Sequence, residues 1–139
     1  MARGQLSVEF FLIVAFVLVL ATMLLSNVEA QLNDTKDLNR AATAKAAVAE
    51  VSHAVNAVAL QGTGAMLNKE VFVPPETSCF SYNATAGALQ CDTGKNIVSG
   101  PALVTAPNVS VSCARTGWMT AQARNEGGAN VSVYCIALG

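Results

Sequence analysis

The chain has 139 residues, of which 53% are hydrophobic and 12% charged, with a formal net charge of −1. The charged fraction is about half that of ordinary soluble domains, and the near-neutral charge excludes the basic surface with which proteins bind nucleic acid. A chain of this length fits one domain plus one membrane-compatible segment.

The N-terminal segment holds the main concentration of apolar residues. No charged residue occurs from Phe10 to Leu25, a run of 16 residues, or 18 when it is counted from Val8 across Glu9. At 1.5 Å per residue the longer count gives roughly 27 Å, close to a hydrocarbon core of about 30 Å. Glu9 therefore places an ionisable carboxylate directly before a segment that is apolar enough to enter a membrane.

One uninterrupted helix is predicted from about Gln5 to Leu60, because neither Pro nor Gly occurs in that range. Gly62 and Gly64 supply its stop. Such a helix is about 84 Å long, too long for the residues after it to cover. Its apolar first third must therefore be covered by lipid or by copies of itself.

The second half of this helix carries an apolar stripe with steps of three and four residues. The stripe consists of Ala41, Ala44, Val48, Val51, Val55 and Val58. The residues predicted to lie off it are Arg40, Thr43, Lys45, Glu50 and Ser52. The stripe is expected to carry a small C-terminal antiparallel β-rich head, which makes the fold class α+β.

Strand-like segments follow the two glycines at 71–73, 77–82, 88–92, 108–113 and 130–135. If Tyr82 faces Ala88 across the intervening turn, Cys79 stands directly opposite Cys91. This register favours a disulfide between these two cysteines. The second bridge would then join Cys113 and Cys135, while the two other connectivities stay open.

Two of these segments resemble each other, "NVSVSC" at 108–113 and "NVSVYC" at 130–135. Alternation in the first points Val109, Val111 and Cys113 inward. The cysteines end their segments at the same relative position, so a bridge between them requires parallel neighbours or a longer path than a tight hairpin. Tyr134 and the following Ile136 and Leu138 share one strand face, which is expected to pack on the helix. Trp118 lies outside any strand pattern and is either an exposed contact or a lid on the core.

All four cysteines and all four N-x-[ST] sequons follow the apolar run, which predicts an oxidising, extracellular setting. Four sequons exceed the one or two that chance gives for ten Asn and nineteen Ser or Thr. The candidates for N-glycosylation are Asn33, Asn83, Asn108 and Asn130. A four-cysteine zinc site is the alternative, but no C-x-x-C pair is present and no metal is expected.

Two general interpretations of the N-terminus compete. A secretory signal peptide could be cut after Ala30, but the apolar run exceeds the usual length and Glu9 stands where such peptides carry positive charge. A plain membrane anchor, with Arg3 as a weak positive-inside signal, explains the length and leaves Glu9 without a purpose.

The order of Gly4, Gln5, Ser7 and Glu9 supports a third interpretation. It resembles the processing motif of type IV pilins, specifically archaeal pilins with a class III signal peptide, in which Gly precedes Gln-x-Ser-x-Glu-x-x-x-Leu; Ile13 stands here for the leucine. The resemblance implies that a prepilin peptidase cuts between Gly4 and Gln5. The chain would then comprise a leader peptide (1–4), an apolar helix as membrane segment or filament core (5–26), an amphipathic helix (27–62) and an extracellular head (63–139).

The resemblance also implies how the protein assembles. Glu9 would meet the freed α-amino group of Gln5 on a neighbouring copy, so that the pair sets the register of the filament, with Ser7 part of the same motif. The implied partners are copies of the chain itself, the membrane before assembly, an assembly ATPase and a platform protein. Adhesion by a surface filament is the usual outcome, and an archaellum subunit is a near neighbour of this interpretation.

The rival from another class is a membrane-anchored or secreted, glycosylated binding module that does not polymerise. An enzyme is not expected, because His53 is the single histidine and no Ser-His-Asp set can be built securely around it. No cofactor and no nucleic-acid partner are expected.

Overall fold

The computed structural model describes residues 2–103, 108–113, 116–128 and 130–138, with side chains from Val8 onward. The chain forms two compact units, Met1–Asp37 and Leu38–Gly139. The elements found among the described residues are helix α1 (Ala2–Gln61) and strands β1 (Met66–Val73), β2 (Ser78–Asn83), β3 (Ala88–Asp92), β4 (Ile97–Ala102), β5 (Asn108–Ser112), β6 (Gly117–Gly127) and β7 (Asn130–Ala137).

Helix α1 ends where the sequence predicts. It stops at Gln61, and Gly62 and Gly64 adopt φ values of +94° and +86°. These values lie in the left-handed region that costs glycine little and other residues more. The two glycines therefore turn the chain out of the helix and into β1.

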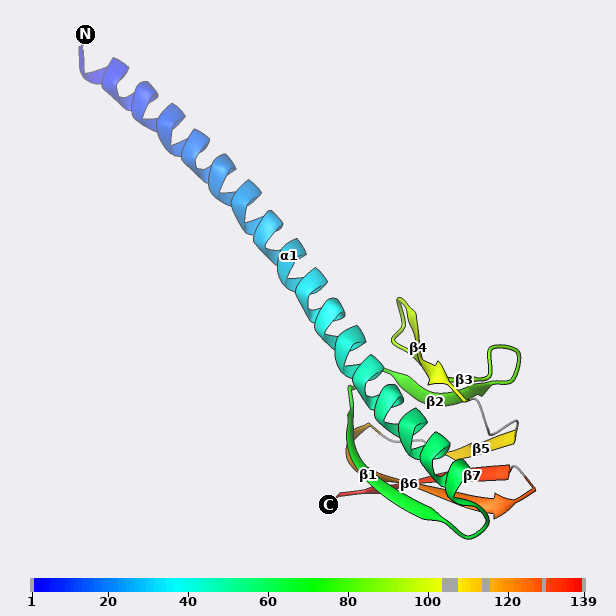
Figure 1. Ribbon diagram of the computed structural model, residues 1–139. Coiled ribbons are helices and arrows are strands. Elements are labelled where there is room, and N and C mark those ends of the chain that lie inside the picture. Colours follow the sequence, from blue (N-terminus) through cyan, green and yellow to red (C-terminus); the bar gives the residue numbers. More distant parts are fainter. Residues whose placement is uncertain (1, 104–107, 114–115, 129, 139) are drawn as a thin grey trace. The chain divides into compact units, whose positions relative to one another are not determined.

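The first sheet has the strand order β1-β6-β7-β5 (Figure 1). The pairs β1–β6 and β6–β7 are antiparallel, whereas β5 and β7 are parallel, with Asn108 opposite Asn130 and Val111 opposite Val133. A disulfide joins Cys113 to Cys135 just beyond the last of these pairs. The predicted alternative of parallel neighbours is thus confirmed.

The second sheet, of order β2-β3-β4, contains the disulfide between Cys79 and Cys91. The predicted register near the turn is wrong by one residue, because Tyr82 faces Leu89 instead of Ala88. A bulge after Cys79 shifts the register back, so that Cys79 and Cys91 are direct partners as predicted. Phe80 in this bulge is buried with a φ of +69°, an unusual conformation for a bulky residue.

The C-terminal part of α1 runs alongside both sheets (Figure 1). It packs against them through one cluster of buried apolar side chains. The predicted stripe is confirmed, with Ala41 half-buried at its end. From α1 the cluster takes Ala44, Ala47, Val48, Val51, Ala54, Val55 and Val58; from the sheets and the residue after β4 it takes Val71, Val73, Phe80, Leu89, Cys91, Leu103, Met119, Ala121, Ala123, Val131 and Val133. The protein is therefore an α+β protein with a long N-terminal helix packed on two small sheets.

Ser52 corrects the predicted surface of the helix. It was expected off the stripe but is fully buried, since it lies four residues after Val48 and three before Val55, on the same helical face. It lies against Gly100 of β4, where an added Cβ would meet the Ser52 hydroxyl and come within 2.9 Å of a methyl group of Val48. Small residues at both positions let β4 lie directly on the helix.

The predicted inward face of the last strand was also wrong. Tyr134, Ile136 and Leu138 are 47%, 57% and 45% exposed, while Val131 and Val133 are buried. Neighbouring strands in register share a face, so the inward valines of β5 require the valines of β7 to point inward as well. Tyr134, Ile136 and Leu138 therefore face away from the helix.

Strand β6 is central in its sheet although the sequence shows no clear strand pattern there. Its inward side chains include Met119, Ala121 and Ala123, and alanine is depleted in strands, which weakens the pattern. Trp118 lies on this strand, 60% exposed, with its ring centroid 5.5 Å from that of Phe72. Of the two predicted roles, exposed contact or lid on the core, this exposure contradicts the lid.

Asn125 connects the end of α1 to β6. Its amide nitrogen donates to the Val58 carbonyl at 3.1 Å, one of the helix-terminal carbonyls without an intrahelical partner. Its side-chain oxygen accepts from the backbone N–H of Gly127 at 2.9 Å, and the residue is only 6% exposed. One side chain thus satisfies a buried acceptor and a turn donor at once.

Replacing Asn125 with alanine is expected to lower the free energy of unfolding by about 1–3 kcal/mol, because a buried carbonyl and an N–H lose their partners. Thermal unfolding of the detergent-solubilised full chain, followed by circular dichroism, measures the change. The matched control is Asn39→Ala at an exposed position of α1, where a change within about 0.5 kcal/mol is expected. Equal midpoints for the two variants would contradict the role of Asn125.

Candidate assembly surface

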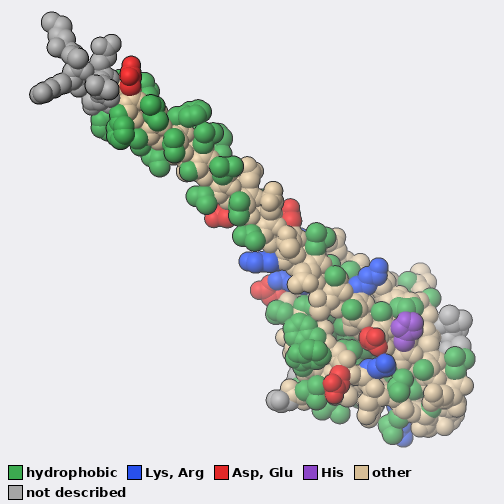
Figure 2. Space-filling model, turned by 60° about the vertical axis from the view of Figure 1, so that its left-hand side comes forward, with side chains coloured by type: hydrophobic (Ala, Val, Ile, Leu, Met, Phe, Trp, Pro, Cys, Tyr) green, Lys and Arg blue, Asp and Glu red, His purple; other side chains and the backbone are tan. Residues whose placement is uncertain are grey.

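The N-terminal unit presents an apolar surface on every side of α1. The large hydrophobic side chains between Val8 and Leu25 are 37–67% exposed, and Figure 2 shows them crowding the visible face of this segment. They are Val8, Phe10, Phe11, Leu12, Ile13, Val14, Phe16, Val17, Leu18, Val19, Leu20, Met23, Leu24 and Leu25. The helix is long and apolar enough to cross a membrane.

This surface is too extensive for a chain that stays alone in water. Burying one such side chain contributes about 1.5–3 kcal/mol, so covering the segment contributes on the order of 20 kcal/mol or more. The 18 most apolar residues have no covering within the protein itself. The cover must come from lipid or from other protein.

Glu9 lies at the N-terminal edge of this surface and is exposed. The next carboxylate along α1 is Glu29, beyond the apolar run. Gly4, Gln5 and Ser7 belong to α1 by their backbone, and their side chains lie outside the described residues. Glu9 is four residues from Gln5, about 6 Å along the helix axis, so the two positions lie about one turn apart.

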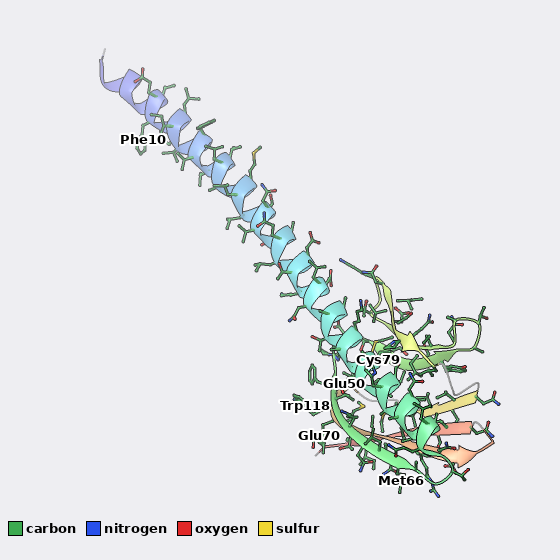
Figure 3. All side chains as sticks on the ribbon, in the orientation of Figure 1. Phe10, Glu50, Met66, Glu70, Cys79 and Trp118 are labelled. Carbon is green, nitrogen blue, oxygen red and sulfur yellow. A yellow bond between two sulfur atoms is a disulfide. The ribbon has the colours of Figure 1, made fainter. Side chains whose placement is uncertain are left out.

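The head bears two further surface features. A hollow of about 430 Å³ is lined by Tyr82, Ala84, Asn108, Val109, Ser110, Glu126, Asn130, Val131 and Ser132. A smaller hollow of about 210 Å³ lies between α1 and β1, beside Trp118. Figure 3 shows the side chain of Trp118 near those of Glu50 and Glu70. Both hollows are open to solvent.

Two ion pairs join the C-terminal part of α1 to the β1 region. Arg40 lies 2.8 Å from Glu76, and Lys69 lies 3.3 Å from Glu50. Three of these four side chains are 42–77% exposed, and exposed pairs contribute about 0–1 kcal/mol each. They therefore add little to the stability of the head, most of which comes from the buried valines and alanines.

The structure separates the four predicted glycosylation candidates by environment. Asn33 lies exposed on α1, and Asn83 lies half-buried at the end of β2. Asn108 and Asn130 begin β5 and β7 and are exposed side by side on the same face of the sheet. Nothing in the sequence alone indicated that these two asparagines are neighbours.

Comparison with protein-family models, with curated proteins and with solved structures found no match to this chain. The architecture itself is pilin-like: a long helix, apolar and exposed at its N-terminal part, continues into a small β head that carries two disulfides. The apolar segment and the disulfides together indicate a membrane-anchored or secreted protein.

Proposed function

We propose that this protein is the structural, non-catalytic subunit of an archaeal type IV pilus-like surface filament. The observation that carries the proposal is the apolar N-terminal part of α1, exposed on all sides and preceded by the Gly-Gln-x-Ser-x-Glu order. In the membrane, lipid covers this surface before assembly. In the filament, the same segment of neighbouring copies covers it.

Processing gives Glu9 its role in this proposal. A prepilin peptidase cuts between Gly4 and Gln5 and creates an α-amino group about one turn from Glu9. The carboxylate of one copy pairs with the amine of the next, so that a copy docked out of step leaves a charge buried and alone. An assembly ATPase and a membrane platform protein are the further partners that the resemblance implies, and adhesion is the expected outcome.

The N-terminus of the mature protein tests this proposal directly. Edman sequencing or mass spectrometry of native surface protein is expected to give Gln5 as the first residue, and electron microscopy of sheared surface material is expected to show filaments containing it. A start at Gln31 would indicate a secreted protein, and a start at Met1 or Ala2 would indicate a plain anchor. Either of these starts overturns the proposal.

The second candidate function is a glycosylated binding module that is anchored or secreted and does not polymerise. The hollow of about 430 Å³ beside Tyr82 favours it, because its volume lies in the range of pockets that hold small ligands. This function predicts a monomer in detergent and no filaments at the cell surface.

A further inference from the structure

We propose that Asn108 is the asparagine, of the four in sequons, that carries an N-linked glycan, and that the folded head itself makes the selection. Transfer of a glycan requires that one enzyme site reach both the asparagine amide and the hydroxyl two residues later. The local structure decides whether these two groups are presented together. The inference needs only that the head is exported and does not depend on polymerisation.

Asn33 fails this requirement because it lies on a helix. Residues two apart on a helix point about 200° apart around the axis, so the side chains of Asn33 and Thr35 do not face the same side. The Thr35 hydroxyl also donates to the Gln31 carbonyl at 2.8 Å. Amide and hydroxyl are therefore presented on opposite sides of α1.

Asn83 fails because its side chain is already engaged. Its oxygen accepts backbone N–H groups from Thr85 and Ala86 at 3.0 and 3.1 Å. Its amide nitrogen, the atom that would bind the sugar, donates to Gln90 at 3.4 Å. The residue is half-buried within this turn.

Asn108 and Asn130 both begin strands, in which residues two apart lie on one face. The difference between them lies in the hydroxyl: Ser110 is exposed, whereas Ser132 is 3% exposed and donates to a carboxylate oxygen of Glu126 at 2.8 Å. β5 is moreover the outer strand of its sheet, while β7 lies between β5 and β6. Of the four sequons, the one at Asn108 therefore presents both groups to solvent on a single face.

The parallel register also limits the pair to one glycan. Asn108 and Asn130 are direct partners on adjacent strands, which lie about 4.8 Å apart. A sugar attached to the first asparagine therefore covers the second. The hollow that borders both residues gives the first sugar room beside the strand.

The chemical step uses a glycan donor activated by a phosphate leaving group. The amide nitrogen of Asn108 forms a bond to the anomeric carbon as the carbon–oxygen bond to the phosphate breaks. The phosphate leaves with that electron pair, and the amide proton is released to a base of the transferase. No oxidant or reductant takes part.

Glycopeptide mass spectrometry of the protein from its native cell tests the proposal. The expected result is a glycan on the peptide containing Asn108, and loss of that mass in Asn108→Gln and in Ser110→Ala. The matched controls Asn130→Gln and Ser132→Ala are expected to keep it. Because the readout is the mass of the subunit, it is independent of whether filaments form.

Several outcomes would overturn this assignment. They are an unmodified Asn108, occupancy at Asn33, Asn83 or Asn130 that equals or exceeds that at Asn108, and transfer of the glycan to Asn130 in Asn108→Gln. Comparable occupancy at all four sequons would show that modification precedes folding, and would overturn selection by the folded head.

Discussion

Replacing Glu9 with valine is expected to leave the protein in the membrane while reducing surface filaments at least tenfold. The valine extends the apolar run, so insertion into lipid is preserved. Within a filament, however, the α-amino group of a neighbouring copy loses its partner, and removing one member of a buried ion pair costs about 3–5 kcal/mol. Immunoblots of membrane fractions and electron microscopy of sheared material measure the two effects separately.

The intact pair is expected to act on register more than on overall stability. Two charges 4 Å apart attract by about 4 kcal/mol at an effective dielectric constant near 20, and desolvation costs several kcal/mol per ion. The two terms nearly cancel for a correctly docked copy and do not cancel for one docked out of step. The control is Glu29→Val, at an exposed carboxylate beyond the apolar run, which is expected to keep its filaments. Abundant normal filaments from Glu9→Val would refute the role of this carboxylate.

Removing the bridge between Cys113 and Cys135 by a double substitution to alanine is expected to destabilise the head by roughly 3 kcal/mol. The bridge closes a loop of sequence separation 22, for which loop entropy gives about this value. It also holds β5, whose ladder is formed with β7 in the order β1-β6-β7-β5. A loss of this size lowers the unfolding midpoint of a domain of about 100 residues by about 10–20 °C.

Calorimetry of the detergent-solubilised full chain measures the midpoint, and hydrogen exchange locates the change. Amides of β5 are expected to lose protection first, because its position at the edge of the sheet leaves it with one strand partner. The control is the double substitution of Cys79 and Cys91 to alanine. It is expected to increase hydrogen exchange in the β2–β3 pair and to leave the amides of β5 protected. Unchanged exchange in β5 after loss of its bridge would contradict this account.

The long helix and its buried stripe were predictable because their signals are local and periodic. The stripe from Ala44 to Val58 repeats at helical spacing, and Gly62 marks the end of the helix. Ser52 was misplaced because it was judged by its hydroxyl, whereas its position on the face follows from spacing alone. Helical geometry outweighed side-chain polarity at this site.

The sheets were only partly predictable because strand partners come from distant parts of the chain. The pairing of Cys79 with Cys91 was correct, but it depends on a bulge at Phe80 that no local pattern shows. β6 was missed because its inward side chains include alanines. Alanine is small enough for the helix to pack closely on the strand, but it is depleted in strands and so weakens the sequence pattern. The role of Asn125 could not be predicted without knowing that β6 is a strand. In a strand, Asn125 follows Ala121 and Ala123 on the inward face, where it contacts the end of α1.

The candidate assembly surface was predictable in its apolar extent, since composition alone marks the run from Phe10 to Leu25. The proposed roles of Gln5, Ser7 and Glu9 rest on the motif alone, because an interface between copies would leave no trace in a single chain. The adjacency of Asn108 and Asn130 required the sheet, since 22 positions separate them in the sequence.

Each disulfide lies within one sheet and joins strands that the backbone already holds in register. Folding can therefore come before oxidation: the hydrogen-bonded ladder brings the correct thiols together, and any mild oxidant met during export closes them without later shuffling. Four cysteines can pair in three ways, and the strand pairing brings the thiols together for only one of them.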